Sequence, residues 1–211
     1  GALIIGVSLG ILCAIFLAFF GSNRVAKIAK AGVQLLAGIP SVVYGFFGLV
    51  VLVPFIRENF GGTGQSILCA SLVLGIMILP TIITLSESAL KAVPEAYYEG
   101  ALALGADHER SVMRVMLPAA ISGVLASIIL AIGRAIGETM AVIMIAGNQV
   151  QMPDAITDGI RTMTANIVLE MGYAADLHRG ALIGTACVLF VFILIINFAF
   201  SALKKKGRNN G

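Results

Sequence analysis

Five long apolar runs limit what this chain can fold into more than any other feature of its sequence. A helix needs about 20 mostly apolar residues to cross the hydrocarbon core of a bilayer. Five stretches reach that length: residues 2–20, 33–56, 66–85, 119–146 and 181–203. Charged residues make up only 12% of the chain, against roughly 25% in a soluble domain. The sequence therefore predicts an all-α, polytopic membrane bundle with five transmembrane helices, in a single domain over residues 1–211.

Two of the apolar runs contain prolines, which a straight helix disfavours. The second run carries Gly38, Ile39 and Pro40 in succession, so we expect a kink there, and the third carries Pro80 near its end. Neighbouring helices can satisfy the backbone groups that such breaks free. Accommodation of packing is a simpler explanation for these breaks than a hinge.

The basic residues are divided unequally between the two sides of a five-span bundle. One side would carry Arg24, Lys27, Lys30, Lys91, Arg110, Arg114, Lys204, Lys205, Lys206 and Arg208. The other would carry only Arg57, Arg161 and Arg179. An excess of Lys and Arg marks the cytoplasmic face, which puts loop 86–118 and the C-terminus in the cytoplasm and loop 147–179 outside. The same count leaves Gly1 outside, so we expect a further span to precede it.

The outside loop, 147–179, contains apolar residues at helical spacing: Ile160, Met163, Ile167, Val168 and Met171. Pro153 and Asp154 could start this helix and Gly172 could end it. It could pack on the bundle at the membrane surface, or offer a docking surface to an external partner. One helix can do both with different faces.

The longest polar stretch, 94–118, reads PEAYYEGALALGADHERSVMRVMLP and lies between the third and fourth runs. Pro94 suits the first turn of a helix, Gly105 can end that helix in a left-handed cap, and Asp107 can cap a second helix. The sequence therefore predicts a pair of short helices joined at a glycine, outside the bilayer.

The spacing within this stretch is more specific than its shape. Glu99, Gly100 and Ala101 are followed after three residues by Gly105, after nine more by Val115, and then by Leu117 and Pro118. This pattern resembles the cytoplasmic coupling loop of ABC-importer permeases, E-A-A, three residues, G, nine residues, I-x-L-P, with Gly100 and Val115 as the two departures. The resemblance implies that the loop docks into a groove of an ATPase subunit. The alternative is an ordinary polar loop whose alanines favour a helix.

Two charged residues, Arg134 and Glu138, fall in the middle of the fourth run. Each costs about 2.5–3.5 kcal/mol at the centre of a membrane helix. Four residues apart on a helix, they would share one face, close to Gly133 and Gly137. An internal ion pair is one interpretation; a functional pathway is the usual reason for ionisable residues inside a membrane.

The segment around this pair, GRAIGETMAV, resembles the corresponding span of phosphate-specific ABC permeases, as do GIPSVVYGFFG in the second run and LEMG followed by HRGAL before the last. The match is closer to the PstC-type subunit than to its PstA-type partner. The resemblance implies a bacterial or archaeal plasma-membrane permease, a homologous second permease, two ATPase subunits and an extracytoplasmic phosphate-binding protein. We expect no cofactor, metal, catalytic residue or nucleic-acid partner.

The chemistry of the pair suits phosphate, which always carries a proton near neutral pH. Arg134 can offer a planar fork of donors to its oxygens, and an ionised Glu138 can accept the proton and repel a fully deprotonated anion. We therefore expect a permease that imports inorganic phosphate. The alternatives are a permease for molybdate or sulfate, a passive anion channel, and an intramembrane enzyme. An enzyme is disfavoured because His108 and His178 both lie in loops.

Overall fold

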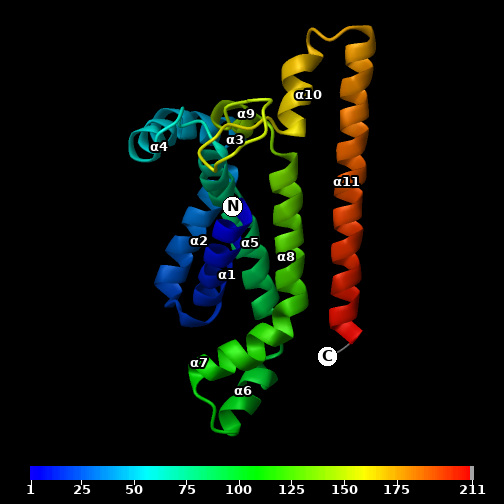
Figure 1. The fold of residues 1–211 in the computed structure, drawn as a ribbon. Coiled ribbons are helices and arrows are strands. Elements are labelled where there is room, and N and C mark those ends of the chain that lie inside the picture. The colour runs from blue at the N-terminus through cyan, green and yellow to red at the C-terminus, as the bar shows by residue number, and fades with distance from the viewer. Residues whose placement is uncertain (210–211) are drawn as a thin grey trace.

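The computed structural model describes residues 1–209, and these residues are almost entirely helical (Figure 1). The elements are α1 (Ala2–Ile15), η1 (Phe16–Phe20), α2 (Asn23–Gly38), α3 (Ser41–Phe47), η2 (Gly48–Leu52), α4 (Val53–Phe60), α5 (Ile67–Lys91), α6 (Glu95–Ala103), α7 (His108–Ser111), η3 (Val112–Met116), α8 (Leu117–Gly137), α9 (Met140–Ile145), α10 (Met163–Met171) and α11 (Asp176–Asn209). The three η elements are single π-helical stretches.

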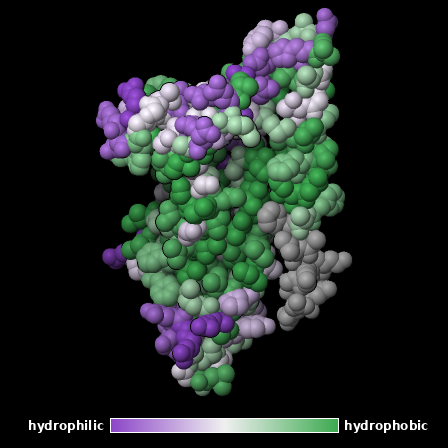
Figure 2. Space-filling model, in the orientation of Figure 1, coloured by the Kyte–Doolittle hydropathy of each residue, from purple (hydrophilic) through white to green (hydrophobic). Residues whose placement is uncertain are grey.

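Five continuous helical segments are long and apolar enough to cross a membrane, which confirms the predicted number of spans. They are Ala2–Phe20, Ser41–Phe60, Ile67–Lys91, His108–Gly137 and Asp176–Ala199. In Figure 2 the middle of the visible face is mostly hydrophobic, and hydrophilic residues gather toward its two ends. This is the distribution that a bilayer imposes on a helical bundle.

The centre of the bundle is α5, which lies between α1 and α8 (Figure 1). Two glycines of α1 allow the close approach: a Cβ on Gly6 would lie 2.5 Å from the side chain of Ile78, and one on Gly10 would lie 2.7 Å from Ile82. Small residues permit such contacts between membrane helices, where packing supplies much of the attraction. In contrast, α11 stands at the edge and is largely exposed over its apolar length.

The predicted second span, 33–56, has the wrong boundaries. The expected kink at Pro40 is a complete break: Ile39 and Pro40 are both extended, with ψ of 126° and 144°. Proline disfavours the helical conformation of the residue before it, so α2 ends at Gly38 and the span runs from Ser41 to Phe60. Pro80 behaves differently, since it lies within an unbroken α5 that continues to Lys91.

The polar stretch 94–118 has the predicted helix–glycine–helix form. Helix α6 ends at Ala103, Gly105 has a φ of 85°, and the Asp107 side chain accepts a hydrogen bond from the backbone N–H of Arg110. The prediction of two short helices is wrong in one respect. The second helix continues from His108 through η3 into α8 as far as Gly137, so only α6 is separate.

The two ends of the bundle carry different elements. The loop after α1, the α6–α7 region and the end of α11 lie at the lower end in Figure 1, whereas α4, α9 and α10 lie at the upper end. Helix α10 begins at Met163, capped by the Thr162 side chain, and not at Pro153 as expected. It ends before Gly172, as predicted. Most of residues 148–162 is irregular.

Candidate functional site

Arg134 lies in the last turn of α8, at the upper end of the bundle, and is exposed. The two glycines beside it face open space, because a Cβ added to Gly133 or Gly137 would meet no atom within 4 Å. Leu130, one turn earlier, is 58% exposed. This face of α8 is therefore not covered by other parts of the described chain. The guanidinium of Arg134 is accessible to a ligand or to another subunit.

Glu138 is not helical, which corrects the expectation that it shares a helix face with Arg134. Its ψ of 129° takes the chain out of α8 one residue after Gly137. Its Oε1 accepts hydrogen bonds from the backbone N–H groups of Thr139 and Ala141, both at 3.2 Å. The carboxylate therefore caps the N-terminus of α9, where a negative charge is favoured.

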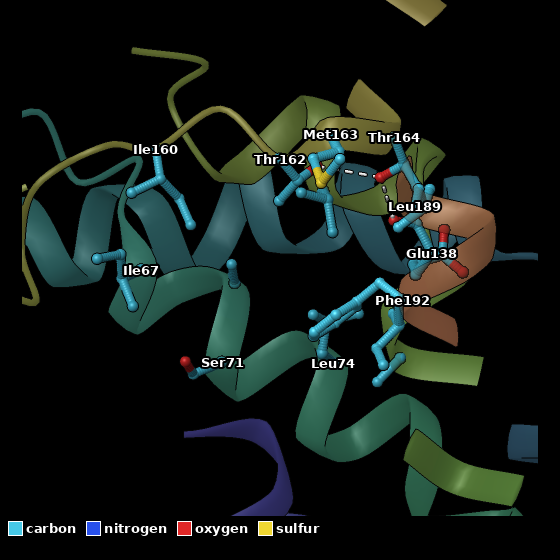
Figure 3. A pocket seen from close by; sticks show the side chains of 14 residues that line it. Ile67, Ser71, Leu74, Glu138, Ile160, Thr162, Met163, Thr164, Leu189 and Phe192 are labelled. Atoms are coloured by element: carbon cyan, nitrogen blue, oxygen red, sulfur yellow. Dashed lines mark hydrogen bonds between the residues drawn. The ribbon is translucent and has the colours of Figure 1, made fainter. Parts of the chain in front are cut away.

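Arg134 and Glu138 thus lie at the end of helix α8 and not in the middle of a helix, and no ion pair joins them. Glu138 lines a cavity of about 310 Å³ enclosed by α5, α8, α9, α10 and α11, whereas Arg134 is not among the lining residues. Figure 3 shows this cavity, with Glu138 and Thr164 on one side. The Thr164 hydroxyl donates to the backbone carbonyl of Glu138 at 3.3 Å and so ties α10 to the α8–α9 turn.

The cavity wall is mostly apolar, and its few polar side chains are Ser71, Glu138, Thr162 and Thr164. Such a lining can hold a small molecule against one carboxylate and a few hydroxyls. Sequence reasoning missed Ser71 and both threonines because they come from segments far apart in the chain and form no motif.

The residues assigned to the coupling loop divide into two groups. Ala101 is 8% exposed, and Leu117 packs against a buried cluster that includes Leu90 and Val112. Glu99, Gly100 and Gly105 are exposed, as is Pro118. The first pair attaches the element to the bundle, and the exposed residues of α6 present a free surface that carries the carboxylates of Glu95 and Glu99.

A buried charge cluster near this region was not predicted. Glu87 on α5 is 7% exposed, and its Oε1 lies 2.6 Å from the Nζ of Lys30 and 2.7 Å from the Nζ of Lys91. The hydrogen bond to Glu87 raises the pKa of Lys30 above its usual value. The cluster fastens α2 to the end of α5. The available signal was the i, i+4 spacing of Glu87 and Lys91.

A second cluster orders the loop at the opposite end. Arg161 donates through Nη1 to Glu170 Oε1 at 2.7 Å and through Nε to the carbonyl of Asn148 at 3.1 Å. A hydrogen bond from Tyr173, followed by the one from Arg161, holds the pKa of Glu170 below its usual value. Residues 148–162 are thereby attached to α10.

These features define a class: a helical membrane bundle with an uncovered, charged helix end on one side and a short exposed helix, α6, on the other. The chain matches the family described as "Binding-protein-dependent transport system inner membrane component" over residues 6–209 and belongs to it. It is thus the membrane-embedded permease subunit of an ABC importer and not an enzyme, since ATP hydrolysis resides in separate subunits.

Curated relatives agree on this class. The chain is 39% identical to the probable ABC transporter permease protein YqgH of Bacillus subtilis, over 95% of the chain and 67% of that protein. It is 33% identical to the phosphate transport system permease protein PstC of Haemophilus influenzae, over 92% and 68%. It is 32% identical to PstC 2 of Mycobacterium tuberculosis, over 100% and 71%.

Solved structures confirm the fold. The MetNI methionine ABC transporter in an inward-facing conformation matches with a TM-score of 0.76 at 20% identity, covering 98% of this chain and 89% of that chain. A bacterial transporter for the acidic polysaccharide alginate matches with a TM-score of 0.65 at 16% identity, covering 95% and 74%. At these identities the likeness concerns the fold alone.

Proposed function

We propose that this chain is a PstC-type permease subunit that moves inorganic phosphate into the cell. The observation that carries the proposal is Arg134, an exposed guanidinium beside two glycines on an uncovered face of α8. Relatives with the printed name PstC, 31–33% identical to the chain, support the choice of phosphate.

The uncovered face of α8 is where we place the homologous second permease, so that the substrate route runs between the two subunits. An anion entering this low-dielectric route needs a compensating positive charge. Arg134 supplies that charge together with a bidentate fork of donors. Glu138 uses Oε1 to cap α9, and its other carboxylate oxygen can accept the proton that phosphate carries.

Loop 94–118 is, in this proposal, the docking element for the ATPase subunits, through Glu99 and the exposed surface of α6 around Gly100 and Gly105. It and the C-terminus then lie in the cytoplasm, where the basic residues are concentrated. Loop 147–179 lies outside, where an extracytoplasmic phosphate-binding protein delivers the substrate.

The test is phosphate uptake by the complete importer reconstituted in vesicles. Arg134→Gln should nearly abolish uptake, because the anion then meets an uncompensated barrier. Arg134→Lys keeps the charge but loses the fork, so a partial defect is expected. Arg57→Gln, which removes an exposed arginine of α4, is the matched control and should leave uptake unchanged. Normal uptake by Arg134→Gln would contradict the assignment.

A permease for another oxyanion is the second candidate. The B. subtilis relative bears a name with no substrate, and half of the Glu138 carboxylate is engaged in capping. Uptake assays with phosphate in competition with sulfate or molybdate distinguish a phosphate permease from a permease for another oxyanion. Preferential uptake of sulfate or molybdate would favour the second candidate, and uptake without ATP would favour a passive channel.

A further inference from the structure

We infer that His108 connects the docking helix α6 mechanically to the first span, with Tyr98 as its partner on one side and Phe20 on the other. The Tyr98 hydroxyl and the His108 Nδ1 are 2.7 Å apart. The Phe20 ring meets the His108 ring edge-on, with centroids 4.8 Å apart and planes at 67°. This inference rests on the proposal that α6 docks the ATPase.

The Tyr98–His108 bond matters because α6 has few other attachments. Of the nine residues of α6, only Ala101 is buried. A cavity of about 380 Å³ lies between α6, η1 and the end of α5, with Ala18, Phe19, Leu90, Val93, Tyr98 and His108 among its lining residues. Close packing cannot transmit a displacement across this open space, whereas the contacts of His108 with Tyr98 and Phe20 connect the two sides directly.

The position of His108 in the chain makes it a branch point. It is the first residue of the continuous helix that ends at Gly137, beside the α8–α9 turn of the candidate substrate site. Phe20 is the last residue of η1, which ends the first span. A displacement of α6 can therefore reach α8 along the chain, and the Phe20–His108 contact adds a direct link from the start of this helix to the end of the first span.

The bond itself is robust to the protonation of the ring. A phenol both donates and accepts, so either neutral tautomer of His108 can pair with it, and a charged imidazolium can donate to it. Tyr98 and His108 are thus positioning residues. Their effect is on how hydrolysis is converted into transport, and not on the binding of substrate or ATP.

The experiment uses the complete importer and measures ATPase association, ATP hydrolysis and phosphate uptake. In Tyr98→Phe, His108→Leu and Phe20→Leu, association and hydrolysis should persist while uptake per ATP falls. The expected fall is about two- to tenfold, the range that the loss of one hydrogen bond or one aromatic pair corresponds to. Phe60→Leu, at an exposed phenylalanine of α4 outside the docking element, is the control and should match the wild type.

Two further variants separate coupling from simple stability. The double variant Tyr98→Phe, His108→Leu should be no worse than His108→Leu alone, because the Tyr98–His108 bond is already lost in that single variant. His108→Asn places an amide near the position of Nδ1 and should restore part of the uptake per ATP. Wild-type uptake per ATP in Tyr98→Phe would overturn the inference, as would a fall in uptake that only follows protein abundance. Failure of the proposed function would show in the wild type itself, as no ATPase association or no phosphate uptake.

Discussion

At the scale of single residues, Glu138 shows how one side chain can be bound into the fold and still face a cavity. Its Oε1 accepts from the backbone N–H groups of Thr139 and Ala141, and the residue lines the cavity beside Thr164. The sequence indicated that an acid at this position is functional. It could not reveal the cap, because the apolar residues after Thr139 continue the span pattern and hide the end of the helix at Gly137.

We expect Glu138→Gln and Glu138→Ala to behave differently. Glutamine keeps a carbonyl oxygen for the cap, so thermal stability in detergent should hold, whereas discrimination against sulfate should weaken with the loss of charge. Alanine removes the cap and should lower stability by about 1 kcal/mol. Thermal unfolding and anion competition measure the two effects. Equal stability of the alanine variant and the wild type would show that the cap contributes nothing.

At the scale of elements, the sequence predicted α6 and the glycine after it well, since capping residues and left-handed glycines are local signals. It failed where a helix break is set by one residue inside an apolar run, as at Pro40. Hydropathy cannot distinguish a kink from a complete break, and Pro40 and Pro80 have opposite outcomes. The outcome depends on the neighbouring helices, which the sequence does not place.

The bend at Gly105 should be essential to the docking element. Gly105 has a φ of 85° and its N–H donates to the carbonyl of Leu102 at 2.9 Å. Proline can adopt neither feature, so Gly105→Pro should abolish ATPase association in a pull-down while the protein still inserts. Asparagine tolerates a left-handed conformation, so Gly105→Asn should show a smaller defect.

Glu99→Arg should weaken the same association by reversing the one exposed charge in the middle of α6, without altering the bend. Normal association and uptake in both Gly105→Pro and Glu99→Arg would contradict a coupling role for this loop.

The Glu87 cluster should tolerate the loss of one lysine but not of both. After Lys30→Met or Lys91→Met the remaining lysine still pairs with the carboxylate, and a half-exposed ion pair contributes about 1 kcal/mol or less. The double variant leaves a buried carboxylate unpaired, which costs about 3–5 kcal/mol. Membrane abundance and thermal stability should therefore fall sharply only in the double variant. Lys27→Met, at an exposed position of α2, the helix that carries Lys30, is the control. Small losses of stability that simply add in the double variant would show that the two lysines do not share the pairing with Glu87.

At the scale of the whole molecule, two independent features place the same elements together. The charge count assigns the loop after the first span, the polar stretch 94–118 and the C-terminus to one side, and the structure brings the first two and the end of α11 to one end of the bundle. The number of spans was predictable because it follows from length and hydropathy alone. The separation of Arg134 from the Glu138 cavity was not, because it depends on where α8 stops.

The orientation of that bundle in the membrane can be tested with single cysteines and a membrane-impermeant maleimide. Cys13 and Cys187 are exposed and are first replaced by alanine, whereas Cys69 is buried and can stay.

Met152→Cys and Leu104→Cys then probe opposite ends of the bundle, since these side chains are 90% and 91% exposed. Met152→Cys should react in intact spheroplasts and Leu104→Cys only after lysis, because the excess of basic residues holds the α6 end in the cytoplasm. Reaction of both from the same side would refute the five-span topology, and the reverse order would invert the orientation and remove α6 from the reach of ATP.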